Sequence, residues 1–440
     1  MSAVAAGGIN LLRSRLLVAL VFSLSLASYV YRGPYLALRS DSGDFATVYG
    51  AARAWTRGLN PYDHAELNRQ LAEAGGPAAL KITPLHRPSV YFLPAMPVAA
   101  IIASLPWRSA RVLWCVLSAI IMAGGVLYVV LRNLPLTHSG KWLCASVILV
   151  LATPGIAGLR FANPGMLVIG LTAFAIQLAL ENRWNWSGLL LGAALCLKPQ
   201  IAICGLAALA LWRKSKPVVI GASLFALSGF IAAAQARSTG TLLVWIRTQQ
   251  ANILQSLAPG AVNDPSPAHP ESWQLLNLQV IVSLFVHSRR IADLVVWAFA
   301  VLAIATFFVI RKNTAAPSFW RDLAFICAID ALVAYHRNYD AELFVALIPF
   351  VFELWREHRR ELALLIATPL ALLLSSYETL LSKLMNSPDS NPGLAYLLLA
   401  RLPAFAVVTL TVLTIVAELT ARRKLGNHRD SPIDVTEFVR

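Results

Sequence analysis

Charged residues are scarce in this sequence. Asp, Glu, Lys and Arg make up 13% of its 440 residues, whereas a soluble domain has about 25%. Hydrophobic residues make up 58%, which leaves too few polar side chains to cover a surface in water. This composition excludes soluble, disordered, fibrous and disulfide-scaffold proteins.

Acids and cysteines are also few, and each shortage excludes a kind of site. The 22 acids do not balance the 37 basic residues, so the net charge is +15. Because no basic run is long, nucleic acid is excluded as a partner, and the excess of positive charge favours anionic headgroups or a phosphate-bearing substrate.

The cysteines lie in apolar runs without CxxC spacing, which is typical of core residues rather than of a metal site. They are Cys115, Cys144, Cys196, Cys204 and Cys327. The sequence also lacks HExxH, GxSxG and P-loop signatures.

Long apolar runs dominate the sequence instead. A membrane-spanning helix needs about 20 apolar residues, and the candidate stretches lie near 16–32, 89–105, 109–131, 141–159, 163–180, 186–212, 217–236, 292–310, 320–335, 339–355, 361–377 and 395–419. The sequence therefore predicts an all-α polytopic membrane protein with about 12 transmembrane helices.

The stretch 186–212 leaves the exact number of crossings open. Lys198-Pro199-Gln200 interrupts it, so it forms either one broken helix or two short ones. Pieces of about 13 residues are short for a full crossing, which favours the single broken helix. If 186–212 crosses the membrane twice while both termini lie inside, another segment such as 89–105 must be re-entrant.

Clusters of Lys and Arg predict the side of the membrane that each loop occupies, because cytoplasmic loops carry the excess of positive charge. These clusters lie at 13–15, 213–216, 311–321, 356–360 and 422–424. Counting spans between them places both termini in the cytoplasm. It places the segments 32–88, 237–291, 335–340 and 378–394 outside.

This count predicts one integral membrane domain over residues 1–420 and a cytoplasmic basic tail over 421–440. The large outside loops lie near 32–88 and 237–291, and we expect the second to form a lid over a cavity. The first apolar stretch lacks a small-residue cleavage site, so we expect it to remain as an anchor.

The first outside loop is dense in ionisable and aromatic residues. Val48, Ala51 and Trp55 recur at helical spacing, which predicts an amphipathic helix on the outer membrane surface. Asp44 then lies near the N-terminus of this helix, where backbone N–H groups and the helix dipole keep a carboxylate ionised. Two interpretations of Asp41 and Asp44 stay open: a helix N-cap and a functional acid.

A second polar cluster lies between two predicted spans on the same outside face. It reads Tyr335-His336-Arg337-Asn338-Tyr339-Asp340. Anchoring at the interface is the common role of such residues, but six ligand-type residues in a row favour a functional site. Asp330, within the preceding span, adds a carboxylate at membrane depth, which marks either a pairing partner or a water-filled cavity.

Lys198-Pro199 provides a third polar feature, inside apolar sequence. An ammonium group at this depth either snorkels to an interface or faces a cavity or polar ligand. Pro199 breaks the helix, which is tolerated where protein or water satisfies the freed carbonyls. The functional interpretation is a counter-charge for an anionic headgroup such as a lipid phosphate.

Together these features resemble glycosyltransferase family 87, a group of polytopic enzymes of the GT-C fold that use polyprenyl-phosphate sugars. The resemblance covers about residues 10–420. The elements that carry it are Asp44-Phe45, Val48-Tyr49, the turn Gly58-Leu59-Asn60-Pro61-Tyr62-Asp63, Lys198-Pro199 and His336-x-x-Tyr339-Asp340. The chain departs from the family at Arg160-Phe161-Ala162-Asn163-Pro164-Gly165, where members often have a Gly-Gln-x-Asn element.

The resemblance implies a GT-C-type bundle and an inverting transfer of a mannose-like hexose from a polyprenyl phosphate to a hydroxyl of a lipid or glycan acceptor. It implies Asp44 as the general base. It implies three cationic ligands of the donor phosphate, which are Lys198, His336 and Arg337. The expected substrate-binding residues are Asp41, Tyr49, Asn60, Tyr62, Tyr339 and Asp340.

We expect no metal and no cofactor, although the Asp41-x-x-Asp44 spacing leaves a divalent cation open. The expected partners are the lipid-linked donor, the acceptor and membrane lipids. The expected location is a bacterial inner membrane, with the active site facing the periplasm or exterior. The alternative is a transporter or flippase of a lipid-linked or anionic substrate, but such proteins usually show internal repeats, and the sequence shows none.

Overall fold

The computed structural model is all-helical. It describes residues 2–40, 42–76, 89–238, 242–267, 269, 271–314, 317–375 and 398–429, and these residues form no β-strand. In chain order the helices of the first half are α1 (Ser2–Val30), the π-helix η1 (Tyr31–Tyr35), α2 (Gly43–Thr56), α3 (His64–Glu73), α4 (Ala95–Ala103), α5 (Trp107–Asn133), α6 (His138–Leu151), α7 (Thr153–Arg160), α8 (Pro164–Leu180), α9 (Trp184–Leu197) and α10 (Pro199–Leu211).

The second half continues with longer and shorter helices in alternation. They are α11 (Ser215–Ser238), α12 (Leu242–Ser256), η2 (Ser272–Gln274), α13 (Gln279–Val282), α14 (Arg289–Lys312), α15 (Phe319–Val333), η3 (Asn338–Leu347), α16 (Ile348–Arg356), α17 (Arg360–Leu374) and α20 (Leu402–Arg429). Both η2 and η3 are 3₁₀-helices.

Among the described residues, 5 helices are long and apolar enough to cross a membrane. They cover Arg15–Tyr35, Trp107–Asn133, Ser215–Arg237, Arg289–Lys312 and Leu402–Ala421. The pair α6 and α7 provides a further span if it crosses as one unit, and it bends by 49° at its break. These candidate spans indicate an integral membrane protein.

Other predicted spans are shorter in the structure. The stretch 89–105 contains only α4, whose 9 residues cannot cross alone. The stretch 186–212 forms α9 and α10, which meet at Lys198 as the Lys-Pro pair predicts. The stretch 339–355 begins as the 3₁₀-helix η3 and continues as α16.

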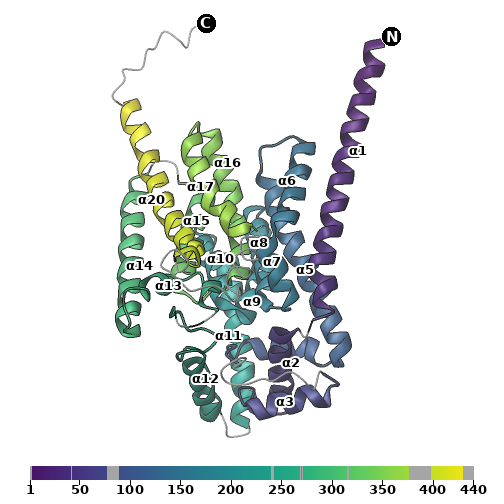
Figure 1. The fold of residues 1–440 in the computed structure, drawn as a ribbon, viewed down its shortest axis with the longest axis vertical. Coiled ribbons are helices and arrows are strands. Elements are labelled where there is room, and N and C mark those ends of the chain that lie inside the picture. The colour runs from purple at the N-terminus through teal and green to yellow at the C-terminus, as the bar shows by residue number, and fades with distance from the viewer. Residues whose placement is uncertain are drawn as a thin grey trace, which may run out of the picture.

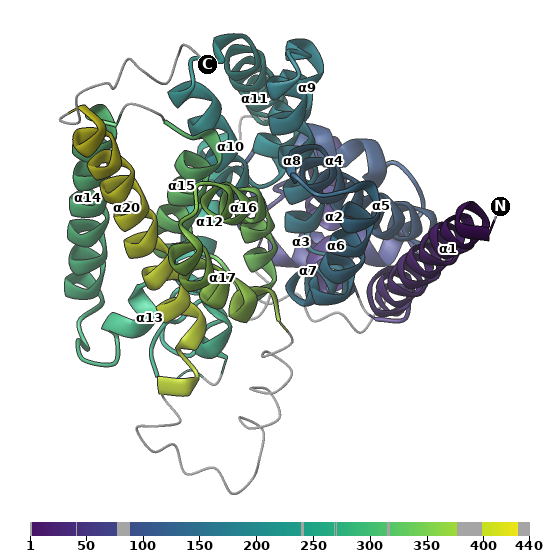
Figure 2. The same cartoon turned by 90° about the horizontal axis from the view of Figure 1, so that it is seen from above.

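Figure 1 shows the N-terminal end of α1 and the C-terminal end of α20 at the same end of the molecule, while α2, α3 and α12 lie at the opposite end. The positive charges predict that these two ends of the molecule lie on opposite sides of the membrane, and this orientation stays a prediction. Seen from above, α1 lies at one edge and α14 and α20 at the other (Figure 2).

Helix α8 is buried along nearly its whole length, as expected for a helix that is apolar on all sides. It approaches α5 very closely, because a Cβ built at Gly170 would lie 2.2 Å from the carbonyl oxygen of Ile121. Only glycine permits backbones to approach this closely. The contact fixes α8, and therefore the residues at its N-terminus, against the rest of the bundle.

Helix α2 confirms the helical spacing predicted for the first loop, but it does not lie on the surface. Most of its residues are buried, from Phe45 through Ala54. The small residues Gly50 and Ala51 allow this, because a Cβ built at Gly50 would lie 3.0 Å from the carbonyl oxygen of Leu67 in α3. The helix ends at Thr56, and Gly58 has φ +70°, as the predicted stop and turn require.

Candidate active site

The turn between α7 and α8 is built from Phe161, Ala162 and Asn163. Asn163 caps α8, because its Oδ1 accepts a hydrogen bond from the Gly165 backbone N–H at 2.7 Å. Ala162 has φ +54°, a left-handed conformation that is costly for a residue with a Cβ. The Trp114 indole N–H donates to the Ala162 carbonyl oxygen at 2.9 Å and so holds this strained turn in place.

The start of α2 docks on that turn. Ser42, which precedes the helix, also has a left-handed φ of 51°. The Asp44 backbone N–H then donates to the Phe161 carbonyl oxygen at 3.3 Å, and the Asn163 Nδ2 donates to the Asp44 carboxylate at 2.7 Å. Asp44 lies in the first turn of α2, as predicted, and its side chain is only partly buried.

Lys198 contacts the other end of the Asn163 side-chain amide, at its oxygen. It lies between α9 and α10 with φ −152° and ψ 82°, and is 7% exposed. Its Nζ donates to both carboxylate oxygens of Asp340, at 2.7 and 2.9 Å. It also contacts Asn163 Oδ1 at 3.5 Å and lies 5.4 Å from the centre of the Tyr339 ring.

His336 extends this cluster. Its Nδ1 lies 3.3 Å from Asp340 and its Nε2 lies 2.8 Å from Asp330. Burial lowers the pKa of His336, but the two carboxylates outweigh this effect and raise the pKa to about 9. His336 is therefore protonated near neutral pH.

One connected chain of contacts results, and it runs from Asp44 through Asn163, Lys198, Asp340 and His336 to Asp330. The residues predicted from three distant parts of the sequence thus lie together. Lys198 and protonated His336 balance Asp340 and Asp330. Within the part of the chain that the structure describes, Asp44 is the carboxylate of this cluster without a cationic partner.

Tyr339 lies beside the cluster, and its hydroxyl accepts a hydrogen bond from Asn163 Nδ2 at 3.1 Å. Arg337 points elsewhere. Its guanidinium donates to the Tyr335 hydroxyl at 2.6 Å, the Gln274 side chain at 2.9 Å and the Val262 carbonyl at 2.7 Å. These bonds tie it to the second outside loop, so its expected contact with the donor phosphate stays a prediction.

The other predicted substrate-binding residues support the fold of the first loop. Buried Tyr49 and Tyr62 donate their hydroxyl hydrogens to the carbonyl oxygens of Leu105 and Tyr91. The Asn60 Oδ1 accepts from the Tyr62 backbone N–H at 3.1 Å, and its Nδ2 donates to Thr248 in α12. Their contact with substrate stays a prediction. Asp41 lies outside the described residues.

Asn163 is the central residue that the sequence reasoning missed. The chain reads Asn-Pro-Gly at this position, which is a common start of a helix. One signal in the sequence did point to this position. Residues 160–165 depart from the Gly-Gln-x-Asn element that family members often have, but this departure did not assign a role to Asn163.

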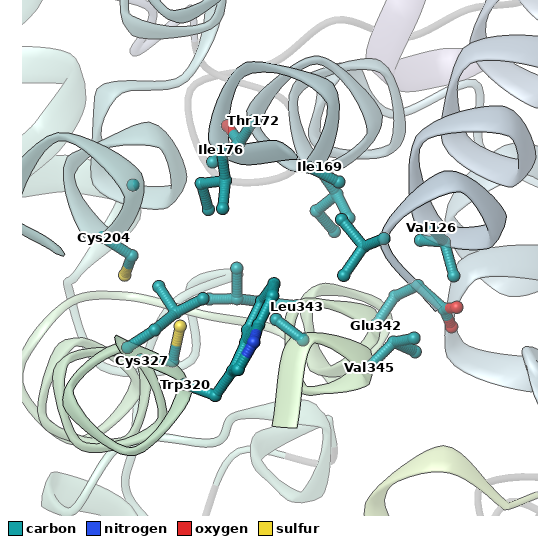
Figure 3. Close-up of a pocket in the computed structure, with 15 residues that line it drawn as sticks. Val126, Ile169, Thr172, Ile176, Cys204, Trp320, Cys327, Glu342, Leu343 and Val345 are labelled. Atoms are coloured by element: carbon teal, nitrogen blue, oxygen red, sulfur yellow. The ribbon is translucent and has the colours of Figure 1, made fainter. Parts of the chain in front are cut away.

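An apolar cavity lies between α5, α8, α10, α15 and η3, with Trp320, Cys327 and Ile169 around it and Glu342 at its edge (Figure 3). Its volume of about 30 Å³ exceeds the roughly 10–15 Å³ that one water molecule requires. It cannot hold a sugar as it stands. Among the described residues, no group of three His, Cys, Asp or Glu side chains could hold a metal ion.

These observations define an integral membrane protein with a buried polar site. A family model for glycosyltransferase family 87 matches residues 90–335, which is more than half of the chain. The chain therefore belongs to family 87 and is a membrane glycosyltransferase. The matched region contains Asn163 and Lys198, while Asp44 and His336 lie on either side of it. No curated protein and no solved structure matches the chain.

The raised pKa of His336 predicts a pH dependence of stability. Its proton stabilises the folded state fully below the ordinary pKa of about 6.5, and this contribution is lost as the pH rises through about 9. We expect the melting temperature of the purified wild type to fall when the pH is raised from 7 to 10. This fall should exceed that of the His336→Gln variant by about 3 °C. The control is His287→Gln, at an exposed histidine. Equal falls in the wild type and His336→Gln would contradict the assigned protonation state.

Proposed function

We propose that this protein transfers a mannose-like hexose from a polyprenyl phosphate to a hydroxyl of a lipid or glycan acceptor, on the outer face of the membrane and with inversion. The observation that supports this most directly is the Asn163 amide. It contacts the Asp44 carboxylate on one side and the Lys198 ammonium on the other. A base and a cation are thus held at a short, fixed separation.

Asp44 acts as the general base in this proposal. The acceptor hydroxyl oxygen attacks the anomeric carbon while its proton passes to Asp44, and the bond from that carbon to the phosphate oxygen breaks. One Asp44 oxygen, Oδ2, accepts from Asn163. The other accepts no hydrogen bond from the described residues, so it is free to receive the proton.

Lys198 stabilises the leaving phosphate, and His336 supports it. The phosphate takes both electrons of the broken bond, so fixed cations close to it lower the barrier. Lys198 is already held by Asp340, and this pair keeps the ammonium oriented before the donor binds. Protonated His336 contributes positive charge on the other side of Asp340.

Three helix N-termini add to this field. Asp44 lies at the start of α2, Asn163 caps α8, and Lys198 precedes α10. Each N-terminus carries the partial positive charge of its helix dipole, so it attracts an anion. A site with three such ends fits a phosphate better than a neutral ligand.

The proposal includes the GT-C-type bundle of about 12 crossings, with the shorter apolar helices completing the set, and the periplasmic or exterior orientation. The positions of α2, α3 and α12 at the end opposite the N-terminal end of α1 and the C-terminal end of α20 support that orientation (Figure 1). Tyr339 and Asp340 line the substrate site in this arrangement. Asn60 joins the two outside loops through its hydrogen bond to Thr248, and substrate contacts of Tyr49, Asn60, Tyr62 and Arg337 are part of the same proposal.

Replacement of the base tests the reaction. We expect Asp44→Asn to reduce sugar transfer by about 10²–10⁴-fold, since an amide cannot accept the proton. Expression and membrane insertion should stay normal. The assay measures transfer from radiolabelled polyprenyl-phosphate hexoses in vesicles, with Asp293→Asn as the matched control at an exposed aspartate. Near-normal transfer by Asp44→Asn would remove this residue from the base role.

Replacement of the cation tests donor binding. We expect Lys198→Met to lower kcat/KM for the lipid donor by about 10–100-fold, as loss of a charged hydrogen bond does. The KM for the acceptor should change little. Because Lys198→Met leaves Asp340 buried without its partner, the double variant with Asp340→Asn controls for misfolding. A folded double variant with an acceptor defect alone would contradict the assignment.

A further inference from the structure

We infer that the exposed ring of Phe161 is the platform on which an acceptor sugar stacks, so that the acceptor ends in a pyranose rather than in a simple lipid alcohol or a protein hydroxyl. This inference rests on the proposed function, since it identifies the acceptor of the same site. It is drawn from the position of the ring beside Tyr339, whose hydroxyl shares the Asn163 amide with the Asp44 carboxylate.

The backbone places Phe161 directly beside the base. The Phe161 carbonyl oxygen accepts from the Asp44 backbone N–H at 3.3 Å, and the next residue but one, Asn163, donates to the Asp44 carboxylate. The Phe161 ring is 50% exposed. Its centre lies 6.4 Å from that of the Tyr339 ring, at an interplanar angle of 51°.

The chain next to Phe161 is polar. Arg160 is exposed, and its carbonyl oxygen accepts from the Ser40 hydroxyl at 2.7 Å. Exposed Arg39 lies one residue before Ser40, with its guanidinium 4.6 Å from the centre of the Tyr35 ring. Phe161 is thus half exposed in a polar part of the chain, where an apolar ring gains free energy by being covered.

The ligand that suits this position has an apolar face and polar edges. A pyranose presents axial C–H groups on one face, which meet the negative face of an aromatic ring favourably. Its hydroxyls remain at the edge, where one of them can pass its proton to Asp44. A linear alcohol or a serine side chain has no such face and would leave the ring uncovered.

The strained backbone supports the same conclusion. Phe161 precedes Ala162, which is held at φ +54° by the hydrogen bond from Trp114. This turn orients Phe161 and Asn163 together toward the start of α2. A ring that served only as a membrane anchor would not need this link to the base.

The test uses the full-length protein in vesicles with a labelled polyprenyl-phosphate hexose, and it compares octyl hexopyranosides with octanol as acceptors. We expect the wild type to prefer the pyranosides. Phe161→Ala should raise the KM for the pyranosides about tenfold, because an aromatic contact is worth up to about 1.5 kcal/mol. The donor KM should stay within about twofold. Phe161→Trp should retain the low KM, and Phe285→Ala is the control at an exposed phenylalanine elsewhere.

Equal use of octanol and pyranosides by the wild type would overturn the inference, as would an unchanged pyranoside KM in Phe161→Ala. These outcomes are distinct from failure of the proposed function. That failure would appear as activity in Asp44→Asn, whatever the acceptor. A melting temperature for Phe161→Ala within about 2 °C of the wild type would show that a raised KM does not come from unfolding of the turn.

Discussion

The buried ion pair between Lys198 and Asp340 is the interaction on which the site depends. Both side chains are almost fully buried, and an unpaired charge in that position would cost several kcal/mol. The pair therefore forces the break between α9 and α10 to lie against the start of η3. Asn163 then joins this pair to Asp44, because its amide oxygen faces the ammonium and its amide nitrogen faces the carboxylate. An asparagine can satisfy both neighbours at once, since it carries an acceptor and a donor.

The arrangement also explains why the helices around the site are short. A continuous helix through residue 198 would carry Lys198 away from a helix end and bury its ammonium among apolar neighbours. Interrupted helices instead bring polar termini to the depth of the site, which is tolerated where protein or water satisfies the backbone. The turn between α7 and α8 and the 3₁₀-helix η3 serve the same purpose, because each one ends a helix beside the polar cluster.

Much of this site could be predicted from residue types out of place in an apolar sequence. Lys198 stood out for that reason, whereas Asp44 and His336 stood out in polar segments predicted to lie outside, and the structure brings the three together. Asn163 could not be found this way, because an asparagine before proline is an ordinary helix start. The burial of α2 was also missed, since helical spacing identifies one apolar face but does not show that glycine and alanine allow neighbours to cover the others. The directions of Tyr49 and Arg337 were unpredictable because sequence order does not show which neighbour a side chain bonds.

The most direct test of this account is an experimental structure of the protein in a lipid nanodisc with a polyprenyl phosphate bound. The account predicts a phosphate oxygen about 2.7–2.9 Å from Lys198 Nζ, as in a charged hydrogen bond, with the Asp44 carboxylate facing the same cavity. A phosphate bound away from Lys198, or on the side of the membrane opposite Asp44, would contradict it.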